Sequence, residues 1–116
     1  MSSLTESEYI AAADRELSRL IDALDELQAD FEGVLDAELS NGIVTITLPG
    51  GPPFVLNSHR AARQLWLAAD RTAWHFDYLK DEERWVAQKT SEELWTTLES
   101  ALSGRLGRKI SLQRAG

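Results

Sequence analysis

The sequence contains no cysteine and only two histidines, His59 and His75. Without thiols the chain has no disulfide bonds, no thiol catalysis and no thiolate-bound zinc or iron–sulfur cluster, and two imidazoles are too few for a closed zinc site. No serine or threonine stands in a motif typical of an activated nucleophile. We therefore expect neither covalent catalysis nor a structural zinc site.

Long apolar runs are missing as well. No apolar stretch approaches the ~20 residues needed to span a bilayer, and the first residues lack a basic region followed by an apolar segment. The sequence therefore predicts a cytoplasmic protein. Its 116 residues suit a single domain over residues 1–116, with a core over about 4–112 and a short mobile tail at 113–116.

Basic residues are scarce in the first 40 positions, where only Arg15 and Arg19 oppose eleven acids and give a net charge of −9. Residues 41–116 carry a net charge of +2, which accounts for the total of −7. An acidic surface repels nucleic-acid phosphates and anionic lipids, so we expect neither nucleic acid nor membrane as a partner. Cations or a basic protein are favoured instead.

Apolar residues recur every three or four positions from about Leu4 to Leu27, which predicts a long amphipathic helix. Thr5 and Glu8 form a capping box at its start. Short segments with strand character follow, at residues 34–39, 43–48, 54–57, 64–69, 74–78 and 85–88. The first helix is thus followed by a series of strands.

Short turns connect the strands. The pair Asn41 and Gly42 is typical of a two-residue hairpin turn, so the strands should be antiparallel. Thr90 with Glu93 predicts the start of a second helix that ends near Gly104. The order predicts an α+β fold, a two-layer α-β sandwich with an antiparallel sheet of five to six strands and the N- and C-terminal helices packed on one face.

Carboxylates gather on the polar side of the first helix. Asp22, Asp25 and Glu26 have helical spacing and point away from the apolar stripe, and Glu8 is expected on the same side. Further acids follow in the turn and the first strand. We call the following seven residues the acidic ridge: Asp22, Asp25, Glu26, Asp30, Glu32, Asp36 and Glu38.

The acidic ridge lowers stability, because like charges at helical spacing cost about 0.2–0.5 kcal/mol per pair and acids near a helix C-terminus oppose the helix dipole. One interpretation is a solvated face that keeps the protein soluble. The other is attraction of hard cations such as iron, which carboxylate oxygens bind weakly and in several places. The spacing resembles no calcium loop and no rigid iron site.

Residues 64–69 alternate, with Leu65 and Leu67 on one face and Gln64 and Trp66 on the other. If the leucines lie under the helices, Trp66 is exposed and suited to an interface. If Trp66 belongs to the core, the leucines face outward. The pattern alone leaves both assignments open.

The two histidines and the remaining aromatic residues are easier to assign. Trp74, Phe76 and Tyr78 alternate with polar residues, so these aromatics are expected in the core and His75 at the surface. His59 is expected in a polar loop. His75 is thus predicted to be a surface residue rather than a ligand, and the sequence assigns no role to either histidine.

Several segments keep a characteristic order and spacing: 41–48, 54–57, 64–68, 74–77 and 93–95. The most specific is the Asn-x6-Gln-x-Trp pattern of Asn57, Gln64 and Trp66, which follows an acidic first helix. Over about residues 7–112 the chain resembles the frataxin family, specifically its bacterial CyaY branch. His59 and Ala61 stand where that family usually has Gln and Pro.

The resemblance implies an iron-binding regulator of iron–sulfur cluster assembly that is not an enzyme. Its partners would be the cysteine desulfurase and the iron–sulfur scaffold protein, and it would be a monomer that can form iron-dependent oligomers. Iron would bind weakly at the surface, on Asp22, Asp25, Glu26, Asp30, Glu32, Asp36 and Glu38. Asn57, Gln64 and Trp66 would contact the partner.

Two alternatives remain beside this interpretation. The chain could be an acidic protein-interaction adaptor without a metal role, or a ferroxidase, which would require a defined carboxylate site. Ile21 and Gln28 also stand where relatives often carry acids, which implies a reduced capacity for iron.

Overall fold

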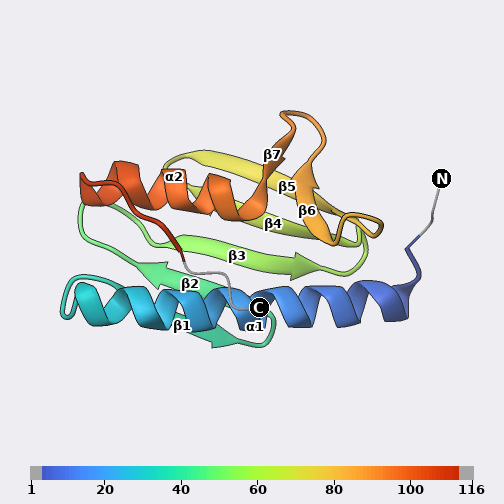
Figure 1. The fold of residues 1–116 in the computed structure, drawn as a ribbon, viewed down its shortest axis with the longest axis horizontal. Helices are drawn as coiled ribbons and strands as arrows, with labels where there is room; N and C mark the ends of the chain where they lie inside the picture. The colour runs from blue at the N-terminus through green and yellow to red at the C-terminus, as the bar shows by residue number, and fades with distance from the viewer. Residues whose placement is uncertain (1–3, 113–116) are drawn as a thin grey trace.

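The computed structural model describes residues 4–112, which form two helices packed on one face of a seven-stranded antiparallel sheet (Figure 1). The strands pair in sequence order, β1 beside β2 and so on to β7, without a crossover. The expected tail at 113–116 lies outside the described residues. The elements are α1 (Glu6–Asp30), β1 (Asp36–Ser40), β2 (Ile43–Thr47), β3 (Phe54–His59), β4 (Gln64–Ala69), β5 (Thr72–Leu79), β6 (Arg84–Ala87), β7 (Glu92–Glu93) and α2 (Leu94–Leu106).

The two-layer α-β sandwich is confirmed, but the strand number differs from the expected five to six. The additional strand is β7, whose two residues pair with Val86 and Ala87 of β6. Two glutamates carry no strand signal of their own, because acidic residues are depleted in strands. Their conformation is set by the neighbouring strand and by the helix that follows.

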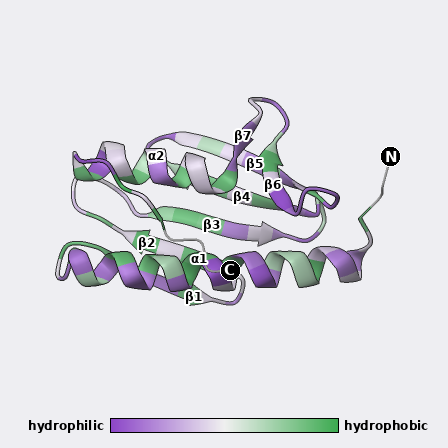
Figure 2. Cartoon of the chain, viewed as in Figure 1, coloured by the Kyte–Doolittle hydropathy of each residue, from purple (hydrophilic) through white to green (hydrophobic). Residues whose placement is uncertain are grey.

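The first helix begins as predicted. Thr5 Oγ1 accepts a hydrogen bond from the Glu8 backbone N–H (3.1 Å), and Glu8 Oε1 accepts one from the Thr5 N–H (3.0 Å). Hydrophobic and hydrophilic residues alternate in groups along α1 (Figure 2), as expected for a helix with one buried face. That face buries Tyr9, Leu17, Leu20 and Leu24.

The second helix starts later than predicted. Its N-cap is Glu93, whose carboxylate accepts hydrogen bonds from the backbone N–H groups of Trp95 (3.0 Å) and Thr96 (3.3 Å). Thr90 instead lies in the turn after β6, where its N–H donates to Ala87 O (3.2 Å). The helix ends at Leu106, two residues after Gly104, and its C-cap is Gly107, which has a left-handed φ of 73°.

The faces of the sheet settle the alternative left open for β4. Leu65 and Leu67 are fully buried beneath the helices, and Trp66 is half-buried on the opposite, open face. In β5, Phe76 is buried while Trp74 and Tyr78 pack against the core with part of their surface exposed. His75 is exposed on the open face, as expected.

Arg105 of α2 contacts two of the connections between strands. Its guanidinium contacts the Asp70 carboxylate in the β4–β5 turn and donates to Pro52 O (3.1 Å) in the β2–β3 connection. It also lies 4.8 Å from the centre of the Phe54 ring. Because its side chain is only 6% exposed, this arginine is a buried link between α2 and two turns of the sheet.

Candidate functional site

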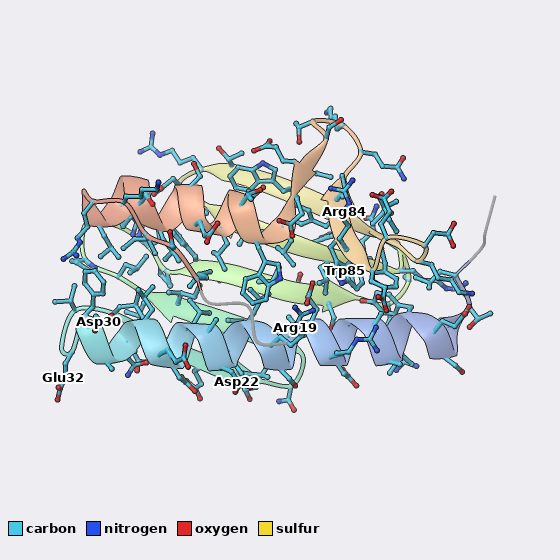
Figure 3. All side chains as sticks on the ribbon, viewed as in Figure 1. Arg19, Asp22, Asp30, Glu32, Arg84 and Trp85 are labelled. Carbon is cyan, nitrogen blue, oxygen red and sulfur yellow. The ribbon has the colours of Figure 1, made fainter. Side chains whose placement is uncertain are left out.

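The acidic ridge is formed by the C-terminal half of α1, the following turn and β1. All seven of its carboxylate residues are exposed. Figure 3 shows Asp22 and Glu32 pointing outward from the edge of the molecule formed by α1, with Asp30 at the end of the same helix. Leu35 is buried and Ala37 and Leu39 pack against the core, so the alternation of the strand turns the ridge acids of β1 outward.

No ridge carboxylate belongs to an ion pair within residues 4–112. The five ion pairs there use other acids: Glu6, Glu8, Glu16, Asp70 and Glu82. The ridge charges are therefore not neutralised by arginines or lysines from elsewhere in the described fold. An unpaired group of neighbouring carboxylates attracts cations and basic surfaces.

Gln28 connects the two elements of the ridge. Its Oε1 accepts a hydrogen bond from the Ala37 backbone N–H (3.2 Å), and its Nε2 lies at the limit of hydrogen-bond distance from Asp36 Oδ1 (3.5 Å). Gln28 thus has a structural role. It joins the last turns of α1 to the first residues of β1.

A shallow depression of about 370 Å³ lies on the ridge, lined by Asp25, Gln28, Ala29 and Glu32. It brings two carboxylates together rather than a full coordination sphere. Within the described part of the chain, no group of three or more His, Cys, Asp or Glu side chains is arranged to hold a metal ion. Such a surface suits weak binding of hydrated cations at several positions and does not form a chelating site.

Glu8 lies outside this unpaired group. Its carboxylate forms an ion pair with Lys80 at the end of β5 and also closes the capping box with Thr5. The hydrogen bond from Lys80, and then that from the Thr5 backbone, lower the pKa of Glu8 from 4.5 to about 2. The same contact raises the pKa of Lys80.

We expect a carboxyl-carbon NMR titration of Glu8 to show a midpoint near pH 2, and Lys80→Met to move that midpoint back toward 4.5. Because the pKa is lower in the folded state, this contact stabilises the protein fully above pH 4.5 and is lost as the pH falls toward 2. Arg60→Met, which removes the ion-pair partner of Glu6 instead, is the control and should leave the Glu8 midpoint unchanged. A Glu8 midpoint that did not respond to this substitution would contradict the assignment.

The three residues predicted to contact a partner come together on the open face. Asn57 is directly opposite Trp66 in the β3–β4 register. Trp66 Nε1–H donates to Gln64 Oε1 (2.8 Å), and Gln64 Nε2 donates to Asp77 Oδ1 on β5 (3.0 Å). The side chains of Gln64 and Trp66 are therefore fixed by a short hydrogen-bond chain.

Both histidines stack on Trp66, which the sequence analysis did not predict. The ring centroids of His59 and Trp66 are 3.8 Å apart and those of Trp66 and His75 are 4.1 Å apart, each with an interplanar angle of 12°. His59 is the last residue of β3 and not part of a loop, and its Nδ1 accepts the Ala62 N–H (3.2 Å). We call these three rings the His–Trp–His stack.

Ile43 was also not singled out from the sequence. It is 40% exposed, and it and Val34 are the exposed large hydrophobic side chains of residues 4–112. In the sheet Ile43 lies directly opposite Asn57. The alternation of β2, with Val44 and Ile46 buried, is the sequence signal that could have placed Ile43 on the open face.

The chain is similar to known proteins in both sequence and structure. A model of the frataxin-like domain matches residues 2–108. Yeast frataxin is 28% identical with a TM-score of 0.72, covering 90% of this chain and 85% of its own. A trimeric frataxin from Saccharomyces cerevisiae, complexed with ferrous iron, is 26% identical with a TM-score of 0.73, covering 93% and 91%.

A frataxin from the bacterium Psychromonas ingrahamii, studied as a member of the CyaY family, has the same fold, with a TM-score of 0.74 at 20% identity and coverage of 92% of this chain and 96% of its own. The family match includes α1, the whole sheet and α2, and therefore both the acidic ridge and the open face. The chain belongs to the frataxin family, which includes the CyaY proteins.

Proposed function

We propose that this protein is an iron-binding regulator of iron–sulfur cluster assembly that acts in the cytoplasm without being an enzyme. The observation that carries the proposal is the acidic ridge: seven exposed, neighbouring carboxylates without an ion-pair partner in the described fold. A related yeast frataxin complexed with ferrous iron supports the metal part of the proposal. Family membership supports the assignment to this process.

Iron in this proposal is cargo held at the surface. The ridge carboxylates repel one another, so a bound cation both gains their attraction and reduces their mutual repulsion. The open depression and the absence of a chelating group in residues 4–112 support low affinity and several binding positions. We expect a monomer without iron, and sedimentation on iron loading measures whether oligomers form.

The same ridge would bind a basic patch of the cysteine desulfurase. Complementary charge raises association rates and makes binding sensitive to salt, because exposed charges are screened over ~10 Å at 0.1 M salt. Iron and the desulfurase would then compete for one surface. The open face, with Asn57, Gln64 and Trp66, would contact the scaffold protein in a manner less sensitive to salt.

The test is the triple variant Asp22→Asn, Asp25→Asn, Glu26→Gln. At low salt we expect its affinity for the desulfurase to fall at least about tenfold, mainly through slower association, and iron-induced amide NMR shifts in the C-terminal half of α1 to disappear. Its thermal stability should not fall, because like-charge pairs are removed. A variant with the same change in net charge elsewhere, Asp14→Asn, Asp81→Asn, Glu83→Gln, is the control.

The outcomes separate the alternatives. If the ridge variant keeps the iron-induced shifts but loses the desulfurase, the protein is an adaptor without a metal role. If iron oxidation depends on one or two specific carboxylates, the ferroxidase interpretation replaces ours. If the ridge variant and the control behave alike in both measurements, the proposal is wrong.

A further inference from the structure

Four side chains form one row across the open face of the sheet. Ile43 lies opposite Asn57, Asn57 opposite Trp66, and Trp66 opposite His75. With a spacing of about 4.8 Å between strands, the row runs ~14 Å from β2 to β5. It crosses the middle of the face that neither helix covers.

Most of the Trp66 indole is already in contact with neighbouring side chains and is therefore not accessible to a partner. Its two ring faces are covered by His59 and His75, and its N–H is donated to Gln64. A partner can reach only the edge of the indole unless the His–Trp–His stack is taken apart. His75 is exposed and His59 is partly exposed, so the two imidazoles are parts of the stack that a partner can reach.

Ile43 has the opposite character. It is 40% exposed, lies at the other end of the row and forms no part of the buried core. Its cross-strand neighbours, Ser40 and Asn57, are uncharged. An exposed branched apolar side chain beside a rigid group of rings resembles the centre of a protein interface, where contacts are apolar and ordered before binding.

The charges around the row indicate what kind of partner fits. Asp77, which lies opposite Gln64 on β5, accepts a hydrogen bond from the Gln64 side chain. Unpaired acids begin at the β1 rim, where Glu38 lies opposite Thr45. The face therefore has a neutral centre and one acidic side, which is complementary to a protein with an apolar patch bordered on that side by lysines or arginines.

We propose that Ile43 is the apolar contact of this face, that the imidazoles of His59 and His75 contact the partner beside it, and that Trp66 is a positioning residue that holds the two imidazoles. The inference rests on the proposed function, since the occupant is the iron–sulfur scaffold protein. It departs from the expectation that Trp66 itself is the anchor. Fixing the stack before binding reduces the entropy lost on association.

The first test compares Ile43→Asp with Val34→Asp, using the scaffold protein as titrant in calorimetry. Val34 is similarly exposed, at 44%, but lies in the turn before β1. Ile43→Asp should weaken binding at least about tenfold, and Val34→Asp by less than about twofold. Ile43→Thr keeps a β-branched side chain in the strand, so it gives the same comparison if Ile43→Asp does not fold.

The second test separates Trp66 from the histidines. Trp66→Phe keeps a ring between the imidazoles and should bind the scaffold within about threefold of wild type, whereas His59→Ala with His75→Ala should weaken binding at least fivefold, although Trp66 is intact. His59→Phe with His75→Phe, which restores the stacking, should recover part of the loss. In the free protein, the alanine pair should increase acrylamide quenching of Trp66, measured in a Trp74→Phe background.

Each outcome has one meaning. If wild type binds neither scaffold nor desulfurase, the proposed function fails and this inference fails with it. If wild type binds the scaffold but Ile43→Asp and Val34→Asp are equal, or Trp66→Phe loses more than the histidine pair, this inference alone is overturned. Unchanged quenching in the alanine pair would also overturn it, because the rings would not cover Trp66 in solution.

Discussion

Replacing Trp85 by alanine is expected to lower the free energy of unfolding by about 3–5 kcal/mol, a large share of the 5–15 kcal/mol typical of a domain. Trp85, labelled in Figure 3, lies on β6. It is 1% exposed. It meets the Tyr9 ring of α1 edge-on, with centroids 6.1 Å apart, and the Tyr78 ring of β5 at 5.0 Å. Truncation removes the side chain that joins the helix to this end of the sheet and leaves a cavity.

Urea unfolding followed by circular dichroism measures this effect, with an unchanged m-value as the sign that only stability has altered. Trp74→Ala is the control for removal of an indole. Trp74 is only partly buried and its N–H bonds to Glu92 near the surface, so a smaller loss of about 1–2 kcal/mol is expected. Equal losses for the two variants would contradict the packing described here.

Arg105→Ala should cost about 2–4 kcal/mol, the second largest effect we expect from a single substitution. The alanine removes the contacts to Asp70, Pro52 O and the Phe54 ring together. Asp70 itself is 49% exposed, so water can replace part of what the carboxylate loses. Arg105→Lys should recover only part of the stability, because a lysine cannot repeat the planar, forked geometry.

Arg108→Ala is the matched control. Arg108 also lies over an aromatic ring, at 5.1 Å from the centre of Phe31, but its side chain is exposed, and we expect a loss of no more than about 1 kcal/mol. Thermal unfolding of the two alanine variants at equal pH and salt gives the comparison. If Arg108→Ala were as destabilising as Arg105→Ala, burial would not be the cause of the difference.

Most of the fold could be predicted because its signals are local. The apolar stripe of α1 and its capping box placed the helix, and Asn41 and Gly42, with φ of 52° and 75°, form the expected two-residue hairpin turn. The late start of α2 and the strand β7 could not be predicted in the same way. Both depend on pairing of Glu92 and Glu93 with β6, a contact that has no pattern in the sequence.

In the candidate site, too, the features with local sequence signals could be predicted and those that depend on contacts between elements could not. Helical spacing and strand alternation were sufficient to bring the ridge carboxylates to the surface, since each of those rules acts within one element. Two other features join different elements. One is the ion pair between Glu8 and Lys80. The other is the stacking of both histidines on Trp66. They follow from the exact register of β3, β4 and β5, which a single sequence does not specify.

The strictly sequential order of the strands affects how the chain folds as it is made. Each hairpin from β1 to β6 can close with the segment synthesised just before it, so most loop closures are short and have a low entropic cost. The N-terminal helix is the exception: the Tyr9 hydroxyl donates to Gln64 O (2.9 Å) and its ring meets Trp85. Helix α1, which is synthesised before the sheet, must therefore wait for nearly all of the strands before its apolar stripe is covered.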